Sequence, residues 1–143
     1  MLSKSYQDAV NELKAVEKLC DPNNIKMLRI LSYSYVELKD TTNGQRYIEK
    51  LLKLLTPDEK ATQDFEYYGK LLILENRDSL GIENLRKAFN MDPTRVDLLS
   101  EIASAWFKLK NYSNVISTYN EKLTIGKDVR ITDYFNLGQA YYY

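Results

Sequence analysis

The sequence contains no histidine, which removes the commonest general base and the commonest zinc ligand from consideration. Its single cysteine, Cys20, excludes an internal disulfide and matches no metal-ligand spacing, so we expect a small buried apolar side chain at a helix end. The sequence also lacks a glycine-rich phosphate loop and a nucleophile with a plausible base. We therefore expect a non-catalytic chain with no metal site and no cofactor.

An excess of charge of either sign is also missing, because 20 basic and 20 acidic residues give a net charge of zero. Nucleic acids and membrane surfaces select for positive charge, so we expect neither as a partner. No apolar run approaches the roughly 18 residues of a membrane span, and the opening MLSKSYQDAV turns polar too early for a signal peptide. The sequence does not define the compartment: the protein is cytoplasmic or, if this chain is a piece of a longer protein, periplasmic.

Residues that break helices are scarce, with three prolines and five glycines among 143 residues. Apolar residues recur every three to four positions, and no sustained alternation with a period of two appears. Short segments rich in turn and N-cap residues divide the chain at regular intervals. This pattern predicts an all-α fold of about eight helices, over residues 3–19, 25–38, 43–55, 62–74, 79–90, 94–108, 112–125 and 131–143.

Four of these segments share one motif, in which a large apolar residue is followed by an apolar residue, a small residue and a second large residue. The sets are Leu28, Leu31, Ser32, Tyr35; Phe65, Tyr68, Gly69, Leu72; Leu99, Ile102, Ala103, Trp106; and Tyr134, Leu137, Gly138, Tyr141, with starts 37, 34 and 35 residues apart. A second small position follows at Gly44, Gly81 and, less well, Val115. An apolar position later in each unit is occupied by Leu51 and then Ala88. In the third unit it holds Lys122, so we expect the neighbouring Leu123 to fill that core position instead.

This period and these small positions resemble the tetratricopeptide repeat, a helix–turn–helix unit of 34 residues. The resemblance covers the whole chain and is most specific in YYGKLL…GIENLRKAFNMDP and YFNLGQAYYY. The sequence resembles a fragment of a longer bacterial protein that consists of such repeats. It implies an α-solenoid of antiparallel helix pairs that coils into a right-handed superhelix. We expect Ser32 against Gly44, and Gly69 against Gly81, where the paired helices cross, because close crossing requires small side chains.

In this interpretation residues 1–143 form one domain built from whole and half repeats. The units are 3–24 (second helix only), 25–61, 62–95, 96–130 and 131–143 (first helix only). The closing tyrosines 141–143 would then face a helix that this sequence does not supply, so we expect a segment of a longer array.

The resemblance implies a scaffold that binds a peptide or a helix of another protein in its concave groove, with the first helix of each unit lining that groove. Carried over position by position, the groove residues are Lys26, Arg29, Tyr33, Glu66, Lys70, Ile73, Ser100, Ser104, Phe107, Phe135, Gln139 and Tyr142. The equivalent positions lack the Lys and Asn pairs with which some members of the family clamp a peptide carboxylate, so that ligand class is not expected.

Two alternatives remain open on the sequence. Helical repeats of about 35 residues also bind single-stranded RNA, although zero net charge argues against this. The second alternative is that the chain is a regulatory segment of a larger protein, or that it associates with itself through the apolar ends of the array.

Overall fold

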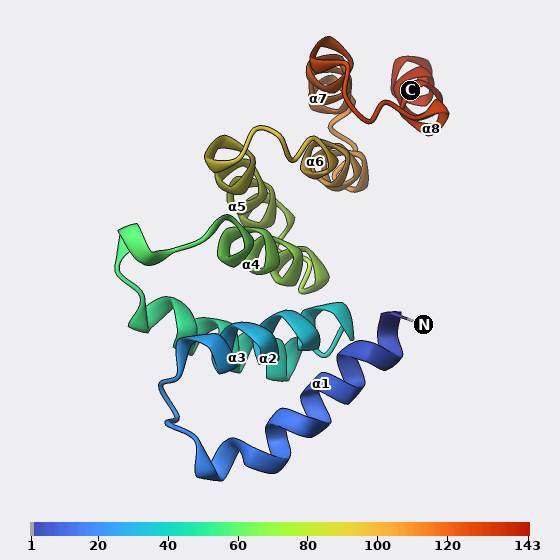
Figure 1. Cartoon of the computed structure of the whole chain (residues 1–143). Coiled ribbons are helices and arrows are strands. Elements are labelled where there is room, and N and C mark those ends of the chain that lie inside the picture. The colour runs from blue at the N-terminus through green and yellow to red at the C-terminus, as the bar shows by residue number, and fades with distance from the viewer. Residues whose placement is uncertain (1) are drawn as a thin grey trace.

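The computed structural model describes residues 2–143, and within that range the regular structure is helical, with no strand. Consecutive helices pack side by side into an elongated stack, with α1 at one end and α8 at the other (Figure 1). The predicted all-α solenoid is therefore confirmed, while the limits of the individual repeat units stay a prediction. The α-helices are α1 Leu2–Val16, α2 Ile25–Glu37, α3 Thr41–Leu54, α4 Thr62–Leu74, α5 Asp78–Met91, α6 Asp97–Lys108, α7 Tyr112–Ile125 and α8 Ile131–Tyr142.

Side-chain hydrogen bonds account for two of the helix starts that differ from the prediction. α3 begins two residues early because the Asp40 carboxylate accepts a hydrogen bond from the Asn43 backbone N–H at 3.1 Å. α6 begins three residues late because the backbone N–H of Thr94 donates to Asp92 at 3.2 Å and holds a turn there. Two short 3₁₀ turns, η1 Glu17–Leu19 and η2 Pro57–Glu59, were not predicted.

Cys20 is exposed, so the expectation of a buried thiol was wrong. It follows η1 in the connection between α1 and α2, and every residue from 20 to 24 is exposed. Connections of this kind run over the surface because water satisfies their backbone polar groups.

The turns inside the three complete helix pairs have the same backbone structure. Lys39, Asn76 and Lys110 follow α2, α4 and α6, and each has a positive φ of 56–60°. In each turn the next residue donates its backbone N–H to a carbonyl five residues back, at 2.8–3.0 Å. This is the Schellman arrangement that ends a helix. Three copies, 37 and 34 residues apart, support the repeat period on backbone evidence alone.

Replacing Lys110 by glycine should stabilise the fold. The left-handed conformation strains a side chain with a Cβ but not glycine, so we expect a gain of about 0.5–1 kcal/mol in the free energy of unfolding. Urea unfolding followed by circular dichroism measures it. Lys127→Gly is the matched control, since Lys127 is exposed in a loop and its own φ is not positive, so the change should give no gain. Equal stability of the parent and Lys110→Gly would contradict the turn geometry.

The closest helix crossing lies between α4 and α5, where Gly69 faces Gly81 as predicted. A methyl group added to Gly81 would lie 2.5 Å from Cγ1 of Ile73 and 2.8 Å from the carbonyl oxygen of Gly69. The corresponding crossing of α2 and α3 is looser. A methyl group on Gly44 would be nearest to Val36 and Leu71, both at 3.4 Å, rather than to Ser32.

The core is a series of apolar clusters distributed along the stack. One cluster joins α1, α2 and α3, and the next joins α2, α3 and α4 through Val36, Ile48 and Leu71. The remaining two join α4, α5 and α6, and then α6, α7 and α8. Each pair of helices therefore buries its apolar faces partly against the neighbouring pair, as repeat proteins do. Among residues 2–143 no helix combines the length and apolar character needed to cross a membrane.

Lys122 occupies the core position that was expected to pass to Leu123, so that expectation was wrong. Its side chain is 3% exposed, and its ammonium donates to Asp133 at 2.8 Å and to the hydroxyl of Ser100 at 2.9 Å. Burial opposes ionisation of Asp133, but hydrogen bonds from Lys122 and from the Arg130 backbone N–H outweigh it and lower the pKa of Asp133. A buried ion pair thus ties α6, α7 and α8 together.

Candidate functional site

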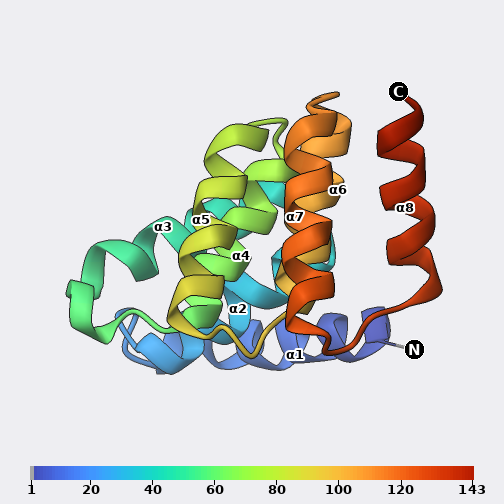
Figure 2. The ribbon, with the colours of Figure 1, turned by 90° about the horizontal axis from the view of Figure 1, so that it is seen from above.

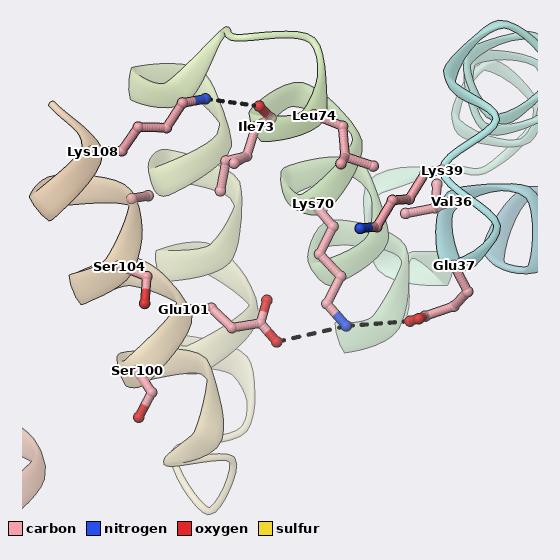
Figure 3. A pocket seen from close by; sticks show the side chains of 11 residues that line it. Val36, Glu37, Lys39, Lys70, Ile73, Leu74, Ser100, Glu101, Ser104 and Lys108 are labelled. Atoms are coloured by element: carbon pink, nitrogen blue, oxygen red, sulfur yellow. Dashed lines mark hydrogen bonds and ion pairs between the residues drawn. The ribbon is translucent and has the colours of Figure 1, made fainter. Parts of the chain in front are cut away.

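A groove lies between α2, α4 and α6, the first helices of three successive pairs. Its cavity volume is about 530 Å³, and Figure 3 shows how its side chains converge from the three helices. We call it the inner groove. It is lined by Val36, Glu37, Lys39, Lys70, Ile73, Leu74, Ser100, Glu101, Ser104, Ala105 and Lys108.

The floor of the inner groove is apolar and its space comes from small residues on α6. Ile73 and Leu74 reach it from α4, and the Leu74 side chain is 38% exposed to solvent. Ser104 and Ala105 face them from α6, where longer side chains would fill the gap. The groove therefore exposes apolar surface within an open volume of about 530 Å³, in which the side chain of a partner can dock.

Lys70 crosses the inner groove and joins all three helices (Figure 3). Its Nζ lies 2.9 Å from Glu66 on its own helix, 3.5 Å from Glu37 of α2 and 3.6 Å from Glu101 of α6. Burial lowers the pKa of Lys70, but the three carboxylates outweigh burial and raise it. Lys70 is consequently charged, and its ion pairs connect the groove walls.

Glu101 lies close to two other carboxylates, and the positive charge of Lys70 does not fully compensate for them. Burial raises the pKa of Glu101, and Lys70 lowers it, but the neighbouring charges of Glu66 and Asp97 raise it further. The carboxylate oxygens of these three residues lie within 4.8 Å of one another. Arg95 pairs with Glu66 at 3.0 Å and with Asp97 at 2.8 Å, so we assign the cluster to an ion-pair network.

The structure brings four of the twelve predicted groove residues into the inner groove. Lys70 and Ile73 come from α4, and Ser100 and Ser104 from α6. Glu66 lies behind them, and its side chain is 5% exposed, with its carboxylate taken by Lys70 and Arg95.

Arg29 and Tyr33 point instead to a neighbouring carboxylate at the start of α4. Arg29 binds Asp64 through two hydrogen bonds of 2.8 and 3.0 Å, and the Tyr33 hydroxyl donates to the same carboxylate. Burial disfavours the ionised form of Asp64, but the hydrogen bonds from Arg29, Tyr33 and the Ala61 backbone N–H outweigh it and lower the pKa of Asp64. The Tyr33 ring also stacks on Tyr67, with centroids 4.2 Å apart. These contacts join α2 to α4.

The other predicted groove residues lie away from the inner groove. Lys26 is exposed at the start of α2. Phe107 and Gln139 line a smaller hollow of about 190 Å³ between α6, α7 and α8. Phe135 and Tyr142 line a separate surface hollow on α8. Whether any of the twelve binds a partner stays a prediction.

Sequence reasoning missed Glu37, Lys39, Glu101 and Lys108, which line the inner groove. Glu101 directly follows the predicted groove residue Ser100, and Glu37 directly follows Val36, which occupies the same repeat position as Ile73 and Phe107. A search that also included each next residue along the helix would have found both. Lys108 directly follows the predicted groove residue Phe107, so the same search would have found it, whereas Lys39 gave no such signal.

Comparisons with solved structures identify the fold. The C-terminal part of a TPR repeat-containing protein from Cytophaga hutchinsonii matches with a TM-score of 0.80 and 26% identity, over 96% of this chain and 53% of that structure. Two crystal structures of MamA match at 20% identity with TM-scores of 0.78 and 0.79, over 96% and 95% of this chain and 73% and 77% of theirs. No protein-family model and no curated protein matches the chain.

The chain has the tetratricopeptide-repeat fold that its sequence resembles. It spans about half the length of the Cytophaga structure. Similarity to such repeat proteins supports a helical-repeat module for protein interaction in general terms.

Proposed function

We propose that the chain is a non-catalytic interaction module that holds a peptide segment or a helix of another protein in the inner groove. The observation that carries this proposal is the apolar floor of Ile73 and Leu74 between three helices that the ion pairs of Lys70 connect. A volume of about 530 Å³ falls within the range of roughly 300–1,000 Å³ that is usual for ligand pockets. The ion pairs connect the walls before a partner binds, which favours a preformed groove over one that must be ordered on binding.

The charges beside the floor favour a partner segment with an apolar side chain next to a lysine or arginine. The apolar side chain would cover Leu74, and the basic group would approach Glu101. Burial and the nearby Glu66 and Asp97 raise the pKa of Glu101, so an added positive charge relieves unfavourable electrostatics there. A peptide carboxylate placed beside Glu101 would instead meet the carboxylate cluster of Glu66, Asp97 and Glu101.

The pairing of basic side chains supports a protein partner over single-stranded RNA. Arg29 pairs with Asp64, Lys70 with Glu66, and Lys108 with Asp78, each at 2.8–2.9 Å. Phosphate binding by these three side chains would require breaking the pairs, whereas RNA-binding surfaces present a positive groove to the backbone.

The test selects peptides from a displayed library on the 143-residue chain and measures their affinities by fluorescence anisotropy. Selected peptides should carry a basic residue beside an apolar one. Leu74→Glu should weaken their binding at least tenfold, because it places a charge on the apolar floor. Glu101→Lys should selectively remove the preference for basic peptides.

Glu83→Lys is the matched control, because it makes the same charge change on α5, where the Glu83 side chain is 57% exposed and lies outside the inner groove. It should leave affinity unchanged. If the peptides bind the Leu74→Glu variant as tightly as the parent, the binding surface lies outside the inner groove. If the library yields no binder, the proposal is wrong.

A further inference from the structure

The inner groove carries charges of opposite sign at its two ends. Figure 2 shows α4 and α6 running in the same direction, so the residues at their C-terminal ends lie at one end of the groove. That end carries Lys108 of α6 and Lys39, which follows α2, and Figure 3 shows both side chains in the upper part of the view. Glu37 and Glu101 lie farther along the groove and flank the ammonium of Lys70. We call these the basic end (Lys39 and Lys108) and the acidic end (Glu37 and Glu101).

The acidic end has more carboxylates than basic groups. Within residues 2–143, four carboxylates at and behind this end share two basic side chains, and the set comprises Glu37, Glu66, Asp97 and Glu101 with Lys70 and Arg95. The acidic end therefore keeps an excess of negative charge, which favours a basic group of a partner at this end.

At the basic end, Lys39 supplies the charge that a partner can use. Lys108 already donates to the buried Asp78 carboxylate at 2.9 Å and to the Asn76 side chain at 3.0 Å. Lys39 donates its backbone N–H to the Val36 carbonyl at 2.9 Å, but its ammonium forms no ion pair or hydrogen bond with any residue that the structure describes. Two ammonium groups beside one carboxylate leave this end positive.

We infer that the inner groove selects a partner segment that carries both charges, with an acidic side chain that binds Lys39 and a basic side chain that binds Glu101. The inference rests on the proposed function and adds the acidic residue and the order of the charges. Along α6 the two ends are about 10 Å apart, because Glu101 and Lys108 are seven positions apart and each helical residue adds about 1.5 Å. An extended segment spans that distance in about three residues, and a helix in about seven. A segment with basic residues alone would leave Lys39 without a partner.

The backbone at Lys39 permits substitutions that test the charge without disturbing the fold. Lys39 has a φ of 58°, a left-handed conformation in which asparagine and aspartate occur more often than most other residues with a side chain. Lys39→Asn therefore removes the charge, and Lys39→Asp reverses it, in a turn that accepts both residues. Lys108 is less suitable, because its replacement would leave the Asp78 carboxylate buried without its cation.

The experiment uses peptides selected on the 143-residue chain from a displayed library, with affinities measured by fluorescence anisotropy. Selected peptides should carry an aspartate or glutamate about three or about seven positions from the basic residue. Changing that acidic residue to its amide should weaken binding to the parent roughly two- to fivefold, as expected for an ion pair that is partly exposed to solvent. The same change should have no effect on binding to Lys39→Asn, and it should strengthen binding to Lys39→Asp.

Lys110→Asp is the matched control. Lys110 occupies the corresponding left-handed position in the turn after α6, with a φ of 56°, but it is exposed and does not line the inner groove. This variant should show the same loss as the parent when the acidic residue of the peptide is changed to its amide.

The possible outcomes separate this inference from the proposed function. Peptides that require Leu74 and Glu101 but show no preference for an acidic residue would overturn the inferred charge order alone. An equal loss with the parent and with Lys39→Asn, or the absence of a loss with Lys110→Asp, would overturn it as well. A library without binders would overturn both the inference and the proposed function.

Discussion

Lys122→Ala should lower the free energy of unfolding by about 3–5 kcal/mol, the usual cost of removing one partner from a buried ion pair. The substitution removes the ammonium that binds both Asp133 and Ser100, and it leaves the Asp133 carboxylate buried with fewer donors. It also leaves a gap where α6, α7 and α8 meet. Urea unfolding followed by circular dichroism at neutral pH measures the loss.

Lys87→Ala is the matched control for Lys122→Ala. Lys87 pairs with Glu83 at 2.7 Å, but both side chains are at least 50% exposed, so the change should stay within about 0.5 kcal/mol. A loss for Lys122→Ala no larger than that of Lys87→Ala would show that the buried pair contributes little to the packing of α8.

Gly81→Ala should cost about 1–3 kcal/mol through overpacking, although alanine is normally the better helix former. The added methyl group would meet Ile73 at 2.5 Å and the Gly69 carbonyl oxygen at 2.8 Å. A side chain can rotate away, but the backbone oxygen moves only if α4 and α5 separate. The midpoint of thermal unfolding should fall accordingly.

Gly138→Ala makes the same substitution at the corresponding small position of α8, where nothing lies within 4 Å. Measured on dilute, monomeric protein, it should raise stability by up to about 1 kcal/mol, because alanine favours the helix more than glycine does. A loss of stability for Gly81→Ala and a gain for Gly138→Ala would establish that the α4–α5 crossing requires a residue without a side chain. A gain in stability for both substitutions would refute the close crossing.

The repeat pattern was sufficient to predict the helix pairing because that pairing depends on residue size at a fixed spacing. Gly69 and Gly81 are small because two backbones meet there, so the sequence itself carries the constraint. Lys122 shows where this reasoning fails. A lysine at a core position looks like a break in the pattern, and its partner Asp133 lies on another helix that only the folded chain brings near.

The candidate site was less predictable than the fold for a related reason. Arg29 and Tyr33 occupy inner-wall positions in the family pattern, but Asp64 binds both of them. Such pairing depends on how one helix pair is displaced against the next, and the spacing of small residues says nothing about that displacement. The contacts of Glu37 and Glu101 with Lys70 have the same origin.

The serial arrangement of the apolar clusters has a consequence for how the molecule loses its structure. Each helix is supported mainly by its immediate neighbours, so an end helix can detach without disturbing the far end. α4 and α5, supported on both sides and joined by the tightest crossing, would open last. For the 143-residue chain studied alone, unfolding would then advance inward from α1 and α8 in gradual steps, and the protection of backbone amides against exchange with solvent would be highest in the middle.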